Sequence, residues 1–276
     1  MTEVEGYIFD VEFTWGFQSK VAGLSKTAPS FYYPPPTTLL GAIAEVLAKE
    51  NRLGEKKGKD IIVKLSEIIS AVGLKPINCV PIKYEDLSKI IAVKNTSGIP
   101  YPDPKQLKSS FDAPATGKTL LASLDDRPPA IRFFLVFKKT EILVDENKIL
   151  ITPNVFWRIH RLGSKESIVS VLNVEECLKI DTLTDIRIET QYSFPLLPQI
   201  QLLKILEHSW GEEVYINPFN LSEYNPINNY IFSKNVIPYI IPLKKAGSQP
   251  AYNIYLNKPA VSYVYNKERV VGYDNC

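Results

Sequence analysis

The residues best suited to bind an anion lie in the segment VFWRIHRLGSKESIVSV, residues 155–171. Guanidinium groups, an ammonium group, a hydroxyl and a flexible glycine occur there within one short turn: Arg158, Arg161, Gly163, Ser164 and Lys165. Such a turn can hold phosphate groups through charge and backbone N–H groups together. A solvated hairpin loop has the same composition, and the segment taken alone favours that simpler interpretation. It is therefore a candidate phosphate site that needs support from the rest of the chain.

Acid/base chemistry by histidine depends on His160 or His208, because the chain has only these two histidines. His160 is flanked by arginines in WRIHRLG, a setting that favours the neutral imidazole and would suit cleavage of RNA. His208 lies at the end of a predicted helix, where capping is the simpler role. Neither has a Cys or His at metal-ligand spacing, and no serine lies in a G-x-S-x-G turn. We predict no metal site and no cofactor, and an endoribonuclease using His160 stays an alternative.

The segment APATGKT, residues 113–119, has the glycine-lysine-threonine end of a phosphate-binding P-loop. Asp112 stands where that motif needs its first glycine, and no hydrophobic strand precedes the segment. Nucleotide hydrolysis is therefore disfavoured. We predict a flexible, basic loop tip.

A second candidate surface is the loop between residues 15 and 36. Trp15 and Phe17 could stack on bases while Lys20 and Lys26 contact phosphates. The same rings could instead pack beneath the sheet, and we expect burial of at least half of the loop's five rings: Trp15, Phe17, Phe31, Tyr32 and Tyr33. Both interpretations remain open for each ring.

The loop ends in a stiff PPP segment that fixes where the following helix begins. We predict Thr37 or Thr38 as the helix cap, and an N-terminus with free N–H groups that could bind an anion. The apolar residues after Thr38 recur with helical spacing as far as Asn51. Small residues at positions 41, 42, 44 and 48 should let this helix lie close to a sheet.

The other elements follow from apolar patterning. Residues 7–15 predict a strand, residues 61–72 a second helix, and IRFFLVFKK at 131–139 a buried strand. Residues 95–130 are rich in proline and predict a long surface excursion, with Lys105 and Lys108 on it. This order favours an α+β, ferredoxin-like domain over a doubly wound sheet, because too few helices exist to cover two faces.

Strand signals dominate the second half of the chain. EILVDENKILI predicts a hairpin that turns at residues 145–147, and IYLNKPAVSYVY predicts another. We place a boundary near residue 141, which gives an N-terminal domain over 1–140 and a β-rich C-terminal domain over 141–276.

Composition adds few constraints. A net charge of +2 over 276 residues does not by itself indicate a nucleic-acid binder, so local patches must carry that argument. The three cysteines are far apart and are predicted to be small buried hydrophobes. No apolar run approaches the roughly 20 residues of a membrane span, and the first residues are acidic, so we expect a cytoplasmic protein without a membrane partner.

Three segments in this order resemble a known family: FTWGFQSKVAGLSKTAPSFYYPPPTTLLGAIAEVLA, RLGSKESIVSV and ETQYSFPL. They are similar to the fifth-numbered Cas family, the RAMP-superfamily subunit that holds the crRNA 5′ handle in type I CRISPR Cascade complexes. The archaeal type I-A branch is the closer likeness and type I-D the next. The resemblance covers the first 50 residues and about 150–196, with the strand at 131–139 where the family would have it.

The resemblance implies a ferredoxin-like (RRM-like, RAMP) N-terminal domain, a thumb at about 95–130 inserted into it, and a β-rich C-terminal domain. Implied partners are the crRNA 5′ handle, the repeating backbone subunit, the large subunit and, through the assembled complex, target DNA. In the type I-C branch the subunit itself cuts RNA with a Tyr, Lys and His constellation. That constellation has no match by motif here, which favours a non-catalytic role; a protein-only scaffold is the remaining alternative.

In this role, four segments would contact RNA: the first loop (residues 15–36), the helix start, the thumb, and the turn within residues 155–171, called the second turn below. The residues assigned to RNA contact are Trp15, Phe17, Lys20, Lys26, Thr37, Thr38, Lys105, Lys108, Arg158, His160, Arg161, Gly163, Ser164 and Lys165.

Overall fold

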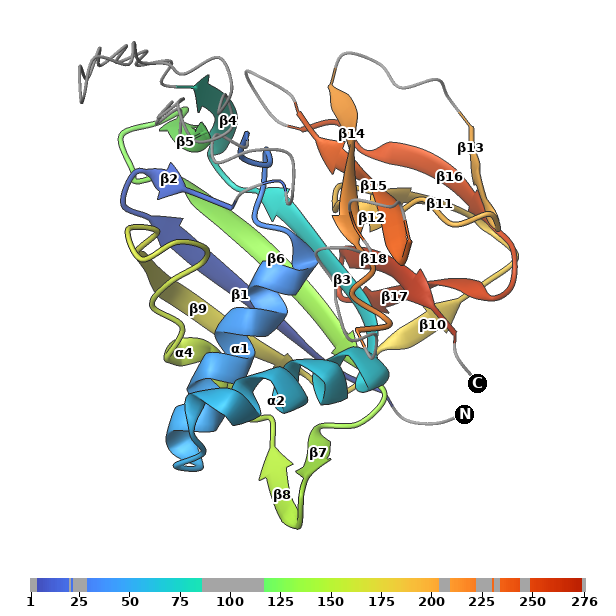
Figure 1. Ribbon diagram of the computed structural model, residues 1–276. Helices are drawn as coiled ribbons and strands as arrows, with labels where there is room; N and C mark the ends of the chain where they lie inside the picture. Colours follow the sequence, from blue (N-terminus) through green and yellow to red (C-terminus); the bar gives the residue numbers. More distant parts are fainter. Residues whose placement is uncertain are drawn as a thin grey trace, which may run out of the picture.

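A computed structural model describes residues 4–19, 21, 29–85, 117–203, 209–221, 230, 234–243 and 249–274. Within them the protein is mostly β, with two long helices and one short one. The helices are α1 (Pro36–Glu50), α2 (Glu55–Ile68) and α4 (Pro153–Trp157). Figure 1 shows the two long helices on one face of a large sheet, with the C-terminal strands gathered at one side.

The large sheet has seven strands in the order β10-β17-β18-β3-β6-β1-β9, and every neighbouring pair is antiparallel. Its strands are β1 (Glu5–Phe13), β3 (Ile69–Pro76), β6 (Ala130–Phe137), β9 (Val169–Cys177), β10 (Asp181–Leu183), β17 (Ala260–Tyr265) and β18 (Glu268–Tyr273). The strand predicted at 7–15 is confirmed as β1, which lies between β6 and β9. The predicted strand at 131–139 is confirmed as β6.

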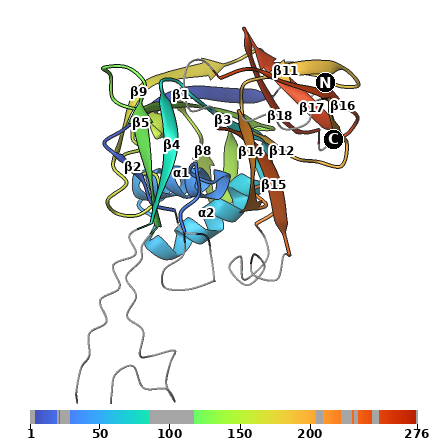
Figure 2. The same ribbon diagram turned by 90° about the horizontal axis from the view of Figure 1, so that it is seen from above.

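Alternation along β1 divides the core between the two faces of the sheet. Phe9 stacks on Phe133 of β6 at 5.4 Å between ring centroids, on the face covered by α1 and α2 (Figure 2). Ile8 and Phe134 point to the other face and pack in a separate cluster with Tyr192. β1 is thus buried on both faces. Its pairing register with β6 and β9 fixes which residues at the ends of these strands lie beside α1.

The start of α1 differs from the prediction. The residue before the helix is Pro35, which has no side-chain cap bond, and neither threonine caps the helix. The N–H groups of Thr38 and Leu39 both donate to Pro35 O, at 2.9 and 3.2 Å. Since Pro36 has no N–H, the helix terminus leaves few donors free for an anion. The stiff proline segment fixes the helix direction, as expected, but it does not create an anion site.

The second helix also differs. It spans Glu55–Ile68 rather than 61–72, and Ile69–Pro76 form β3. The sequence extends the helix too far because a short, mostly apolar segment such as 69–72 has no periodicity that separates a buried strand from a buried helix. Tertiary pairing with β6 decides for the strand.

Part of the predicted proline-rich excursion is a regular hairpin. β4 (Cys79–Glu85) pairs with β5 (Gly117–Ser123) over the full length of both strands, and β5 also pairs with β2 (Gly16–Phe17). The prediction of a surface excursion is therefore wrong for residues 117–123, as is that of a flexible loop tip for Gly117 to Thr119. Residues 86–116, with Lys105 and Lys108, lie outside the described chain.

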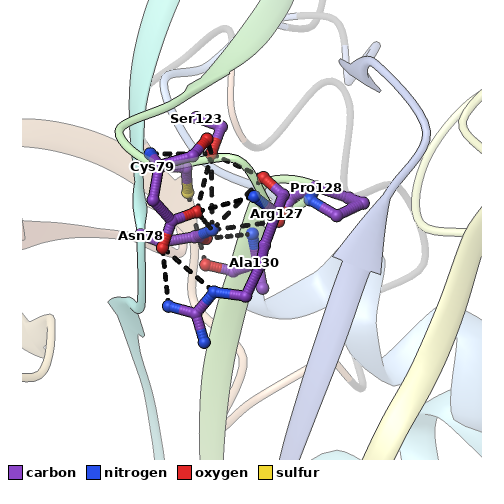
Figure 3. Close-up of polar contacts among 7 residues, drawn as sticks. Asn78, Cys79, Ser123, Arg127, Pro128 and Ala130 are labelled. Carbon is purple, nitrogen blue, oxygen red and sulfur yellow. Dashed lines mark hydrogen bonds and ion pairs between the residues drawn. The ribbon is translucent and has the colours of Figure 1, made fainter.

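The base of this hairpin is held by Asn78, which is 7% exposed (Figure 3). Its carbonyl oxygen accepts the buried Ala130 N–H at 2.8 Å, and its amide group donates to Asp125 Oδ1 at 2.7 Å and to Pro128 O at 3.1 Å. The Cys79 thiol donates to Ala130 O at 3.3 Å. One buried amide thus ties the start of β4 to the start of β6 and fixes the direction in which the hairpin leaves the sheet.

The remaining strands form small sheets. β7 (Glu141–Val144) and β8 (Asn147–Leu150) make the hairpin predicted around residues 145–147. Two three-stranded sheets have the orders β11-β16-β13 and β12-β15-β14. Their strands are β11 (Arg187–Thr190), β12 (Phe194–Pro195), β13 (Ile200–Leu202), β14 (Trp210–Ile216), β15 (Val236–Pro242) and β16 (Tyr252–Leu256).

The second predicted hairpin is wrong in its pairing. Both of its strands exist, but β16 pairs with β11 and β13, whereas β17 pairs with β10 and β18. The large sheet takes strands from both sides of residue 141. The division of the chain into two domains at that residue stays a prediction.

Cys79 and Cys177 are buried free thiols, in agreement with their predicted role as small hydrophobes. Burial raises the pKa of each to about 12, so both remain protonated and unreactive near neutral pH. No helix in the described part of the chain is long and apolar enough to span a membrane.

Candidate nucleic-acid interface

A cleft of about 420 Å³ lies between α1 and the two segments that the sequence singled out. One wall is α1, and the other comes from residues 18–19 and from the turn after α4. Its lining residues are Gln18, Ser19, Thr38, Gly41, Ala42, Glu45, Arg161, Gly163 and Ser164. The structure therefore brings together four of the sequence-assigned residues, namely Thr38, Arg161, Gly163 and Ser164.

Hydrogen bonds join the two segments into one unit. Ser164 N–H donates to Gln18 O at 2.9 Å, and Gln18 N–H donates to Ser167 Oγ at 3.0 Å. The Trp15 indole N–H donates to Glu166 O at 2.9 Å. Segments about 150 residues apart in sequence are thus tied at three points, so their geometry is fixed before any ligand binds.

Gly163 is required for this close approach. Its φ is +121°, a conformation that L side chains rarely adopt, and a Cβ there would lie 2.6 Å from Gln18 O. The neighbouring Gln18 atom is backbone and cannot rotate away. The glycine expected to give a flexible turn instead lets two backbones touch.

Substitution Gly163→Ala is expected to destabilise the protein by about 1–3 kcal/mol, because the backbone must adopt strain or the two segments must separate. Urea unfolding should show a lower midpoint with an unchanged slope. Gly58→Ala is the matched control, since Gly58 lies inside α2 with nothing within 4 Å of an added Cβ. Alanine there should stabilise the helix by about 0.5–1 kcal/mol. Equal midpoints for the two variants would contradict the assignment.

The charges of the cleft centre on Glu45. Its carboxylate accepts Lys49 Nζ at 2.7 Å and Arg161 Nη2 at 3.0 Å. Burial alone would raise the pKa of Glu45, but the hydrogen bonds from Lys49 and Arg161 outweigh it and hold this pKa below the ordinary value of 4.5. The carboxylate therefore stays ionised near neutral pH, and the two cations leave an excess of one positive charge beside the cleft.

The other cations of the second turn lie outside this cleft. Arg158 pairs with Glu50 at 2.9 Å and lines a neighbouring hollow of about 210 Å³ together with exposed His160 and Lys49. Lys165 is exposed and lies 3.9 Å from Glu166. Arg161 and Arg158 thus lie at two neighbouring hollows beside α1, whereas Lys165 lines neither of them.

The aromatic residues of the first loop fall into a buried group and a partly exposed group. Phe17 is fully buried and packs near Phe13, so its assignment to RNA contact is wrong. Phe31 and Tyr33 are buried as well, which confirms that at least half of the five rings belong to the core. Trp15 is partly exposed, and Lys118 Nζ of β5 lies 5.8 Å from its ring centroid.

The cleft includes residues that sequence reasoning missed. The small residues Gly41 and Ala42 line the cleft rather than face a sheet, whereas Ala44 and Ala48 face the core. Glu45 gave no signal because its partner Arg161 lies far along the chain. Ser19 Oγ is 3.2 Å from Thr38 Oγ1, so the threonine expected to cap the helix instead contacts the first loop.

A second missed cluster joins β4 to β14. Glu213 is 8% exposed and accepts Tyr32 N–H at 2.8 Å, Lys83 Nζ at 3.1 Å and the Tyr215 hydroxyl at 2.7 Å. Lys83 Nζ also lies 3.8 Å from the Tyr32 ring centroid. Burial, with Glu213 close by, raises the pKa of Tyr215 well above its usual value, so its hydroxyl stays protonated and can donate to the Glu213 carboxylate. The cluster is fully paired and holds the hairpin against the C-terminal strands.

Several assigned residues lie outside the described chain: Lys20, Lys26, Lys105, Lys108 and His208. Their predicted roles remain predictions. Among the residues that the structure describes, no group of three or more His, Cys, Asp or Glu side chains is placed to hold a metal ion.

Comparison of the chain with known proteins finds similar CRISPR proteins. The family model described as CRISPR-associated protein (Cas_Cas5) matches residues 6–210. The chain is similar to the CRISPR system aCascade subunit Cas5 1 of Saccharolobus solfataricus, with 26% identity over 240 residues, 83% of this chain and 84% of that protein. It is also similar to the crystal structure of a CRISPR protein from Archaeoglobus fulgidus, with 41% identity, a TM-score of 0.71, and coverage of 98% of this chain and 99% of that one.

Proposed function

The chain belongs to the family of CRISPR-associated proteins matched by the Cas_Cas5 model, and on that premise we propose that it is a crRNA-binding subunit of a type I Cascade complex. In this role it holds the crRNA 5′ handle, caps the backbone filament and does not cut RNA. Its partners are the repeating backbone subunit, the large subunit and, through the complex, target DNA. The name of the Saccharolobus relative, a Cascade subunit, supports the assembly.

One observation carries the RNA-binding part of the proposal. Two segments far apart in sequence, residues 18–19 and the turn that contains Arg161, meet at a preformed cleft whose walls offer a guanidinium group, hydroxyls and exposed glycine backbone. Single-stranded RNA is held by such combinations of phosphate contacts and base pockets. A surface salt bridge network without a ligand would need neither the cleft nor the close backbone contact at Gly163.

The sheet supports the RAMP assignment. Taken alone, β1, β3, β6 and β9 lie in the sheet in the order β9-β1-β6-β3. Along the chain, α1 and α2 lie between β1 and β3, and α4 lies between β6 and β9. This is the strand order of a ferredoxin-like domain. The β4-β5 hairpin emerges between β3 and β6, so we place the thumb there, with residues 86–116 as its continuation.

RNA binding by the purified chain is the direct test. Filter binding with crRNA that carries its 5′ handle, in EDTA at physiological salt, should give a saturable complex with intact RNA. The affinity should fall steeply as salt rises. Loss of binding at physiological salt would favour the protein-only scaffold. Cleavage of the RNA in EDTA, abolished by His160→Ala, would replace the proposal with the endoribonuclease alternative.

A further inference from the structure

Gly41 is an unfavourable residue for its position in the protein alone. It lies inside α1, where glycine weakens a helix relative to alanine, and an added Cβ would meet nothing within 4 Å. Packing within the described part of the chain therefore does not require a glycine there. The open space above it is the cleft, because Gly41 is one of the lining residues.

The cleft side of α1 has a regular pattern. Thr38, Gly41, Ala42 and Glu45 follow at the i, i+3, i+4 and i+7 spacing of one helix face, and all four line the cleft. Two small residues thus form a flat floor between a hydroxyl at one end and a carboxylate at the other. A flat floor of this kind suits a planar ring or a sugar better than it suits a lone phosphate.

The opposite wall provides the complementary groups. Arg161, Ser164 and the backbone at Gly163 can meet a phosphate, while Glu45 lies on the helix side. An ionised carboxylate repels phosphate but accepts hydrogen bonds from neutral donors, and each of its oxygens can accept a second bond beyond those from Lys49 and Arg161. A nucleotide carries both kinds of group, since its phosphate is an acceptor and its 2′-hydroxyl or base N–H is a donor.

We propose that the cleft receives one whole nucleotide of the bound RNA, with its sugar or base against Gly41 and Ala42, its phosphate at Arg161, and a donor group hydrogen-bonded to Glu45. The cleft volume of about 420 Å³ lies within the roughly 300–1,000 Å³ of small-ligand pockets. This inference rests on the proposed RNA binding and adds a specificity residue to it. Glu45 selects the nucleotide, whereas the cations set the overall affinity.

A leucine at position 41 tests the occupancy of the cleft. Gly41→Leu places a larger side chain where an added Cβ meets nothing within 4 Å among the described residues, and Gly58→Leu makes the same change in α2, at an equally open position that does not line the cleft. Both variants should fold and melt no lower than the wild type. Only Gly41→Leu should weaken crRNA binding, by about tenfold or more. Wild-type affinity in Gly41→Leu overturns the inference.

Two sets of modified RNA identify the donor that Glu45 meets. Handle RNAs carrying a single 2′-deoxy or a single abasic nucleotide at each position are bound to the wild type and to Glu45→Gln. A penalty at one position that is present in the wild type and reduced in Glu45→Gln assigns the contact, to the sugar in the first set and to the base in the second. If Glu45→Gln binds every RNA more tightly and keeps all penalties, Glu45 only opposes phosphate and the assignment fails.

These results separate the inference from the function on which it rests. If reversal of the second turn's charges abolishes RNA binding while Gly41→Leu preserves it, the protein binds RNA but its cleft stays empty. If the wild-type chain does not bind crRNA at all, the proposed function itself fails.

Discussion

Replacing Arg158, Arg161 and Lys165 together by glutamate is expected to weaken crRNA binding by about a hundredfold or more. Charge-assisted hydrogen bonds contribute about 1.5–3 kcal/mol each, so the removal of three of them can exceed this effect. For a single strand, removing one phosphate interaction lowers the salt slope by about 0.7, and the slope should therefore fall by about two. Filter binding over a range of salt concentrations measures both quantities.

A matched control uses three exposed lysines that do not line the cleft or its neighbouring hollow: Lys179, Lys258 and Lys267. Their reversal makes the same change in net charge but should alter affinity much less and leave the slope nearly unchanged. Circular dichroism and the melting temperature check that each variant is folded, since reversed charges would face Glu45 and Glu50. An equal reduction of affinity in both triple variants would mean that only the net charge matters, and the site assignment would be discarded.

The substitution Arg132→Met is expected to destabilise the fold by about 3 kcal/mol, because it removes the centre of an ionic cluster on the large sheet. Arg132 makes two bonds to Asp10, at 2.6 and 2.7 Å, and one to Glu268 at 2.8 Å. The side chains of Asp10 and Glu268 are only 13% and 18% exposed. Without the arginine, Asp10 would be left as a largely buried charge, while Glu268 would retain Lys75. Urea unfolding monitored by circular dichroism measures the change.

Arg127 provides the control, because Arg127→Met removes an arginine that pairs with Asp125 at 2.6 Å but has 73% of its side chain exposed. An exposed pair of this kind contributes about 0–1 kcal/mol. Similar destabilisation by Arg127→Met and Arg132→Met would show that burial of the cluster does not matter. If Arg132→Met is more stable than the wild type, the desolvation penalty of the charged cluster exceeds the stabilisation from its ion pairs.

Local sequence was sufficient for elements whose pattern fits one structure only. β6 is a dense apolar run of strand length, and the β7-β8 hairpin turns at Asp145, whose φ of +53° suits an aspartate. The existence of α1 followed from the helical spacing of its apolar residues, although the helix begins at Pro36 and not at the predicted threonines. In these cases the information lies within a few neighbouring residues, so the sequence alone is enough.

The wrong predictions for strands share one physical cause. Which strand an apolar segment pairs with depends on residues that are far away in the sequence. Ile69 and its neighbours are apolar enough for either a helix or a strand, and β6 decided between them. The strands β16 and β17 were recognised, but each pairs with other strands, so the connection between them joins two sheets instead of forming a hairpin. The predicted helix cap is wrong for a local reason, because the helix begins at Pro36 and both threonines lie inside its first turn.

For the candidate site, the sequence by itself determined the chemistry: arginines, a glycine and hydroxyls in one turn, and aromatic residues and lysines in one loop. Only the tertiary structure decided which of these groups share a cleft. It buried Phe17, placed Arg158 and Arg161 in different hollows, and turned Gly41 and Glu45 of α1 toward Arg161. The physical reason is that residue type fixes what a group can bind, whereas its neighbours and its exposure follow from the packing of strands and helices that are distant in the chain.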